Sequence, residues 1–135
     1  RSGPADVAAR ALAAIARDHV AIQDSIAAEG AILPLVTMLD SVRDFESHVA
    51  SCVALATLAR ASPTNQVSIA ESGGIPPLVQ LLLSSRADCQ ESASSAIAML
   101  VDQEDNENLH WEVLSAGGIG PLIALLTIGN LMTKQ

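Results

Sequence analysis

Aromatic residues are almost missing from this sequence: its 135 amino acids include one Phe, one Trp and no Tyr. Half of the residues are nevertheless hydrophobic, and Ala and Leu supply most of them. Val and Ile occur at helical rather than alternating spacing, so a β-sheet has little support. This composition favours helices that stack closely on one another.

Basic residues are scarce as well. The chain has seven Lys and Arg against 15 Asp and Glu, which gives a formal charge of −8. This balance argues against nucleic acid as a partner, because binding to phosphates needs clustered Lys and Arg. From Ala87 to Thr133 there are seven acidic residues and no basic one. The excess favours a basic partner, although the run DQEDNEN at 102–108 is also what a solvated loop would carry.

Cysteine is limited to Cys52 and Cys89, which fall in helical segments at places that are not equivalent in the repeat described below. We therefore expect no disulfide, two core thiols, and an intracellular, reducing compartment. His48 lies four residues before Cys52, but two ligands without a CxxC motif do not make a zinc site. No metal is expected.

Motifs of catalysis are missing too. The sequence has no P-loop, no GxGxxG after a strand and no GxSxG, so we expect neither an enzyme nor a cofactor.

The start, RSGPADVAAR, has no initiator Met and no signal-peptide core, which suggests a fragment or a processed product. The uncharged stretch 113–133 is long enough to span a bilayer. Its GGIGP run would interrupt a membrane helix, so no membrane insertion is expected.

What the sequence does contain is a recurring break. EGAILPLV at 29–36, SGGIPPLV at 72–79 and AGGIGPLI at 116–123 align so that Gly30, Gly73 and Gly117 lie 43 and 44 residues apart. Gly adopts the left-handed conformation that commonly ends a helix, and Pro is tolerated in the first turn of the next one. Each break therefore predicts the end of one helix and the start of another.

Three helices fill each period. The first is NQVSIAES at 65–72, whose Val67, Ile69 and Ala70 are expected to face inward. The second is PPLVQLLLSS, buried on nearly every side through Leu78, Val79, Leu81, Leu82 and Leu83. The third, ADCQESASSAIAMLVDQ at 87–103, carries Ala93, Ala96, Ile97 and Leu100 three and four apart, and similar helices begin near Ala5 and Asp44.

These units resemble armadillo repeats, whose period lies in the low forties. NQVSIAESGGIPPLVQLLLSS with SSAIAMLV, and QDSIAAEGAILPLVTML with CVALATLA, carry the resemblance. It implies an all-α fold, a right-handed alpha-alpha superhelix, as one solenoid segment over 1–135. Within it we place a lone third helix at 5–18, repeats at 20–61 and 64–103, and a partial repeat at 107–130. Both ends then look uncapped.

The resemblance also implies a binding surface, the concave face lined by the third helices. Peptide-binding members of the family carry Trp and, four residues on, Asn at positions that correspond here to Arg10 and Ala14 and their repeats. No Trp or Asn stands there, which argues against recognition of nuclear localisation signals. The candidate face, whose residues would otherwise be ordinary solvated surface, comprises Arg10, Arg17, Glu46, Val53, Thr57, Arg60, Asp88, Ser92, Ser95, Met99 and Asp102.

Two functions fit this reading. One is a non-catalytic protein–protein interaction module or scaffold that takes a protein or peptide, with a basic one favoured by charge. The other is a structural subunit permanently embedded in a larger assembly. Trp111 stands where the preceding unit has Val67, and we expect it to pack rather than to be an exposed anchor. The sequence indicates neither the partner nor the organelle.

Overall fold

The computed structural model describes residues 3–40 and 42–133, and within these ranges all regular structure is helical. The all-α prediction is therefore confirmed. In chain order the helices are α1 (Pro4–Ala16), α2 (Val20–Ala28), α3 (Ile32–Thr37), α4 (Phe45–Ala59), α5 (Pro63–Glu71), α6 (Ile75–Leu81), α7 (Ala87–Leu100), α8 (Glu107–Ser115) and α9 (Ile119–Thr133).

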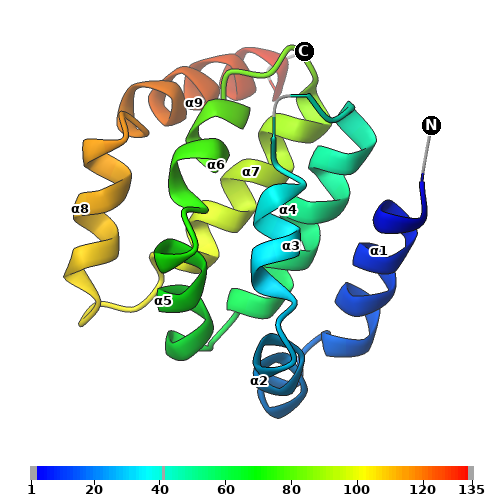
Figure 1. Ribbon diagram of the computed structural model, residues 1–135. Coiled ribbons are helices and arrows are strands. Elements are labelled where there is room, and N and C mark those ends of the chain that lie inside the picture. The colour runs from blue at the N-terminus through cyan, green and yellow to red at the C-terminus, as the bar shows by residue number, and fades with distance from the viewer. Residues whose placement is uncertain (1–2, 41, 134–135) are drawn as a thin grey trace.

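The helices form a solenoid in which the long helices stack side by side. α4 packs between α1 and α7, and these two contacts are the most extensive in the molecule. The shorter helices α2, α3, α5 and α6 form the rest of the layered array, and α8 and α9 close it at one end (Figure 1). The stack of α1, α4 and α7 therefore presents one continuous helical face.

The glycine breaks are the turns between short helices, as predicted. Gly30, Gly73 and Gly117 have φ angles of 95°, 83° and 82°. At the middle break the N–H of Gly73 donates to the carbonyl of Ala70 (3.0 Å) and that of Gly74 to the carbonyl of Ile69 (3.0 Å). These are the two hydrogen bonds of a Schellman motif, which satisfy the carbonyl groups left over at the end of α5.

Side-chain caps begin several helices. An Oδ1 atom of Asp44 accepts a hydrogen bond from the backbone N–H of Ser47 at the start of α4 (2.9 Å). Ser62 does the same for α5 through the N–H of Asn65 (3.2 Å). Each cap satisfies a backbone donor that has no partner within the first turn of its helix.

Small residues form much of the core where the long helices meet. They let helix backbones approach closely, so the stack needs few aromatic residues. The fully or nearly fully buried alanines on the three long helices are Ala9, Ala13, Ala16, Ala50, Ala54, Ala59, Ala93 and Ala96.

Three burial predictions are wrong. Val67 and Trp111 are 37% and 59% exposed, because their shared position in the repeat faces outward on α5 and α8. Trp111 is therefore an exposed side chain and not a packing residue. Leu83 is 64% exposed; it follows Leu82, the C-cap of α6, which is the last buried residue of this segment. The other predicted positions of the second and third helices, Leu78, Val79, Leu81, Leu82, Ala93, Ala96, Ile97 and Leu100, are buried.

Candidate functional site: the face of the long helices

A hollow of about 330 Å³ lies on the face formed by α1, α4 and α7. We call it the concave hollow. The structure brings five of the eleven candidate residues together in it. The other two residues that line it are Ala56 and Asp18. Its lining is Arg17, Asp18, Ala56, Thr57, Arg60, Ser95 and Met99.

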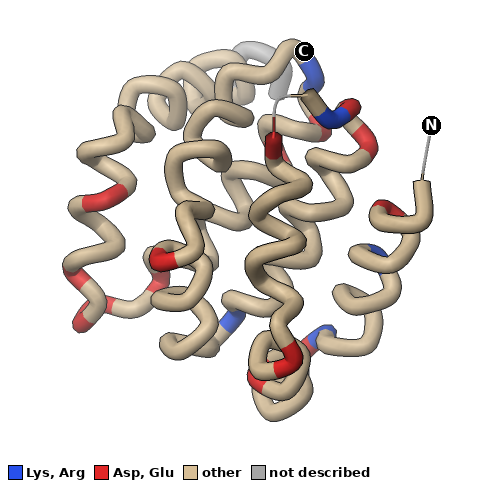
Figure 2. The backbone as a smooth tube through the Cα atoms, viewed as in Figure 1, with Lys and Arg blue, Asp and Glu red and all other residues tan. Residues whose placement is uncertain are grey.

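Two arginines frame the concave hollow at one end of the stack. Arg17 is the C-cap of α1, and Arg60 is the C-cap of α4. They hold equivalent places in their repeats, 43 residues apart, and Figure 2 shows two basic segments at that end of the backbone. The negative ends of two helix dipoles favour cations there.

The positive charges of the two arginines are only weakly compensated by carboxylates of the same chain. The Nε atom of Arg60 lies 3.8 Å from an Oδ1 atom of Asp18, and both side chains are about two-thirds exposed (64% and 69%). Exposed pairs of this kind contribute only about 0 to 1 kcal/mol. Among the described residues, no carboxylate forms an ion pair with Arg17.

Hydroxyl groups on this face differ in their hydrogen bonds. Thr57 Oγ1 donates to the carbonyl of Val53 (2.8 Å) and Ser92 Oγ to that of Asp88 (2.7 Å). Ser95 lines the concave hollow, yet its hydroxyl forms no hydrogen bond within the described part of the chain. Ser95 therefore keeps a donor and an acceptor available to a bound molecule.

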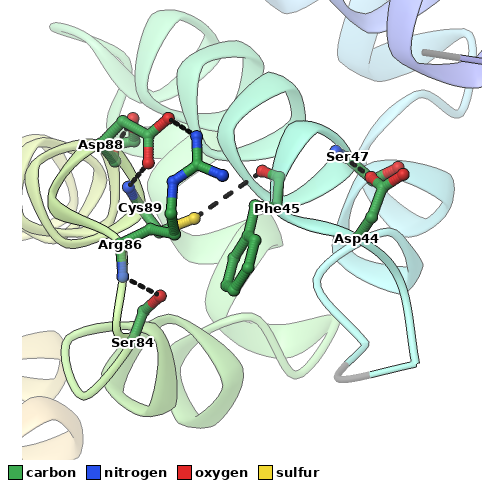
Figure 3. Close-up of polar contacts among 8 residues, drawn as sticks. Asp44, Phe45, Ser47, Ser84, Arg86, Asp88 and Cys89 are labelled. Atoms are coloured by element: carbon green, nitrogen blue, oxygen red, sulfur yellow. Dashed lines mark hydrogen bonds and ion pairs between the residues drawn. The ribbon is translucent and has the colours of Figure 1, made fainter. Parts of the chain in front are cut away.

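The acidic candidates lie outside the concave hollow and have partners of their own. Asp88 Oδ2 accepts a hydrogen bond from Arg86 Nη2 at 2.9 Å, and Arg86 also lies over the ring of Phe45, 5.0 Å from its centroid (Figure 3). Asp102 Oδ1 accepts a hydrogen bond from Gln66 Nε2 (3.0 Å). The remaining candidates do not line the hollow; Arg10, Glu46 and Val53 are exposed and Ser92 is half-buried.

A buried polar ladder, missed at the sequence level, holds the ends of the long helices. Gln23 Nε2 donates to the carbonyl of Ala16 (3.3 Å), and Gln66 Nε2 to that of Ala59 (2.9 Å). In the last unit His110 Nε2 lies 2.9 Å from the carbonyl oxygen of Val101. The sequence signal that could have revealed this ladder is the recurrence of a hydrogen-bonding side chain at Gln23, Gln66 and His110, which lie 43 and 44 residues apart. Two of these bonds end one residue before Arg17 and Arg60, so they help to position the arginines.

Comparison with known proteins identifies one repeat and the fold. The armadillo/beta-catenin-like repeat model matches residues 62–102. Over 90% of this chain, an engineered protein of known structure shares 32% identity with a TM-score of 0.84. A designed armadillo repeat protein in complex with the peptide (KR)4 shares 28% identity over 89% of the chain, with a TM-score of 0.80. Residues 62–102 therefore form an armadillo repeat, and the chain has the fold of armadillo-repeat proteins.

A natural armadillo structure shows the same fold. The armadillo repeats only protein of Plasmodium falciparum matches 93% of this chain with a TM-score of 0.79 and 23% identity, and this chain covers 55% of it. The chain spans about half of the engineered and designed structures, 48% and 49% of their lengths. No curated protein matches the sequence.

Both cysteines of this armadillo chain are free and buried, and they do not form a disulfide. Burial raises the pKa of Cys52 to about 12, and it also raises the pKa of Cys89, whose Sγ lies 3.7 Å from the carbonyl oxygen of Phe45. A thiol with a raised pKa is a poor nucleophile near neutral pH.

Within residues 3–40 and 42–133, no group of three or more His, Cys, Asp or Glu side chains could hold a metal ion.

A larger hollow of about 480 Å³ lies away from the candidate residues. It occupies the edge of the armadillo array where α3 and α6 end, and Leu39, Phe45, His48 and Leu81 are among its lining.

In the described residues no single helix has the length and hydropathy to cross a membrane. α8 and α9 together reach that length and composition, but they are bent by 82°.

Proposed function

We propose that this armadillo chain is a non-catalytic interaction module that binds a peptide or an extended partner segment on the face of α1, α4 and α7, in an intracellular, reducing compartment. One observation carries the proposal. Five candidate residues from three consecutive units converge on the concave hollow. Within the part of the chain that the structure describes, the polar groups of Arg17 and Ser95 there have no internal partner. A designed armadillo repeat protein similar to this chain is in complex with a peptide.

The hollow suits a short recognition element better than a large rigid surface. Its volume is about 330 Å³, which is at the small end of the range of ligand pockets. A peptide that crosses α1, α4 and α7 would place successive side chains against successive repeats, since equivalent positions recur on neighbouring helices.

Selection from a random linear dodecapeptide library tests this function. Peptides selected on the parent chain should lose binding to Ser95→Arg, because the longer side chain fills the hollow. They should bind the matched control Ser25→Arg, because Ser25 is an exposed residue of α2 away from the hollow. Equal binding of selected peptides to the parent and to Ser95→Arg, measured by fluorescence anisotropy, would place the contact surface elsewhere.

One observation favours a second function, that of a structural subunit embedded in an assembly. Apolar side chains of the last unit are exposed, including Trp111 at 59%, Ile123 at 57% and Leu126 at 68%. Such a surface is typical of a protein–protein contact. Under this alternative, an isolated chain should self-associate as its concentration rises, and sedimentation velocity over a concentration series measures that.

A further inference from the structure

The charge inside the concave hollow differs from the charge of the whole chain. The chain has a formal charge of −8, but the ionised side chains that line the hollow are Arg17, Arg60 and Asp18. Two cations and one anion leave a local excess of one positive charge. The acidic character of the molecule therefore does not extend into this hollow.

The two arginines can accept a carboxylate without breaking a strong interaction. Asp18 Oδ1 lies 3.8 Å from Arg60 Nε, which is too far for a hydrogen bond, so the guanidinium of Arg60 keeps its donors for a bound group. A guanidinium binds a carboxylate best through two parallel hydrogen bonds, which gives direction as well as charge. Arg17 adds a second guanidinium, and the Ser95 hydroxyl adds a neutral donor from α7.

Two acidic candidates on this face, Asp88 and Asp102, have polar partners within the chain. Asp88 pairs with Arg86 at 2.9 Å, and Asp102 accepts hydrogen bonds from Gln66 and Gln103. Neither residue lines the concave hollow. A lysine or arginine placed in the hollow would face Arg17 and Arg60 with only Asp18 to compensate.

We propose that the concave hollow is an acid-binding subsite: it takes the carboxylate of an Asp or Glu side chain of the bound peptide between Arg17 and Arg60. The half-buried side chains of Ala56 and Met99 receive an adjacent apolar side chain of the same peptide. This inference rests on the proposed function and names the class of partner. At this subsite it predicts an acidic partner residue, whereas the net charge of the whole chain favoured a basic one.

Octapeptide pools with one fixed central residue, Glu, Gln or Lys, test the subsite on the parent chain. Glu and Gln have nearly the same shape, so their difference isolates the charge. The Glu pool should bind about three- to tenfold more tightly than the Gln pool, as expected for a partly exposed ion pair. The Lys pool should bind weakest of the three. A Gln pool that binds as tightly as the Glu pool would overturn the proposal.

Variants then assign the preference to its residues. Arg17→Ala with Arg60→Ala should remove the Glu preference, and Arg60→Glu should shift preference toward the Lys pool. Arg43→Ala is the control for Arg60→Ala alone, because each variant removes one positive charge and Arg43 does not line the hollow. Retention of the Glu preference by the Arg17 and Arg60 double variant would also refute the subsite.

Two further measurements keep the outcomes distinct. Arg17→Lys with Arg60→Lys retains both charges and should keep a preference for the Glu pool. The preference should be smaller, because Lys cannot form bidentate hydrogen bonds with a carboxylate. A thermal melt checks that this variant folds. If pools bind without acidic preference and Ser95→Arg blocks them, the subsite is wrong while the proposed function stands. If no pool binds the parent, both proposals fail.

Discussion

Two adjacent glycines in the middle break serve different purposes. Gly73 has a φ angle of 83°, and a Cβ added there would meet nothing within 4 Å. Gly74 has an ordinary φ of −77°, but its added Cβ would lie 2.8 Å from Ile69 Cγ2 and 3.0 Å from the Ile69 carbonyl oxygen. The first position is therefore limited by backbone conformation, and the second by space.

We expect Gly73→Val to lower the free energy of unfolding by about 1 to 2 kcal/mol or more, because a β-branched residue is strained at positive φ. Gly73→Asn should cost less, since Asn tolerates the left-handed region. Urea unfolding followed by circular dichroism measures both. A neutral Gly73→Val variant would show that the turn does not depend on this φ angle.

At the scale of the element, α4 is the central helix of the stack, and its first turn is capped by a charged group. The backbone N–H of Ser47 donates to the carboxylate of Asp44 and holds the pKa of that carboxyl below its ordinary value of 3.8. The ionised form is therefore favoured in the folded state. The cap contributes stability above the ordinary pKa and loses it as the pH falls through the lowered folded pKa.

Asp44→Asn gives a test of this pH dependence. Asn also caps helices, so the variant keeps the hydrogen bond to Ser47 and removes only the charge. The parent should melt at a higher temperature than Asp44→Asn at about pH 6, and this difference should shrink at about pH 2 as Asp44 is protonated. Melting curves of both proteins across the range measure it. A difference independent of pH would contradict the assignment.

At the scale of the whole molecule, equivalent residues have different environments. Leu82 is 2% exposed, whereas Leu126, 44 residues later, is 68% exposed. At the other end Ile15 is 60% exposed and its equivalent, Leu58, is fully buried. A repeat buries its apolar side chains only where a neighbouring repeat covers them.

This contrast predicts a matched pair of variants. Leu82→Ala should lower the free energy of unfolding by about 2 to 5 kcal/mol, because it removes buried methyl groups and leaves a cavity. Leu126→Ala, the same change at the equivalent place, should alter it by no more than about 0.5 kcal/mol. Chemical denaturation of both variants compares them directly. A large loss for Leu126→Ala would mean that this surface is covered in solution.

Much of the fold could be predicted from local signals. The glycines at 30, 73 and 117 mark the turns that the structure contains, because the left-handed conformation is a property of a single residue and its neighbours. The buried face of α7 was also predicted correctly through Ala93, Ala96 and Ile97. Trp111 was not, because whether an outward position is covered depends on elements distant in the sequence.

The candidate site could be predicted only in part. The face of the long helices followed from the repeat, and Arg17, Thr57, Arg60, Ser95 and Met99 do line one hollow. Their use in binding stays a prediction. The engagement of Asp102 by Gln66 could not be foreseen, because the two residues lie 36 positions apart in the sequence.

The sequence by itself determined where the glycine breaks separate one helix from the next and that the units repeat, since glycine geometry, proline geometry and helical spacing act within a few residues. Only the tertiary structure decided which of several equivalent side chains are buried, which carboxylates accept hydrogen bonds from distant residues, and that two arginines line one hollow. Those properties depend on which helices pack together, and on the water and charge that packing removes from each side chain.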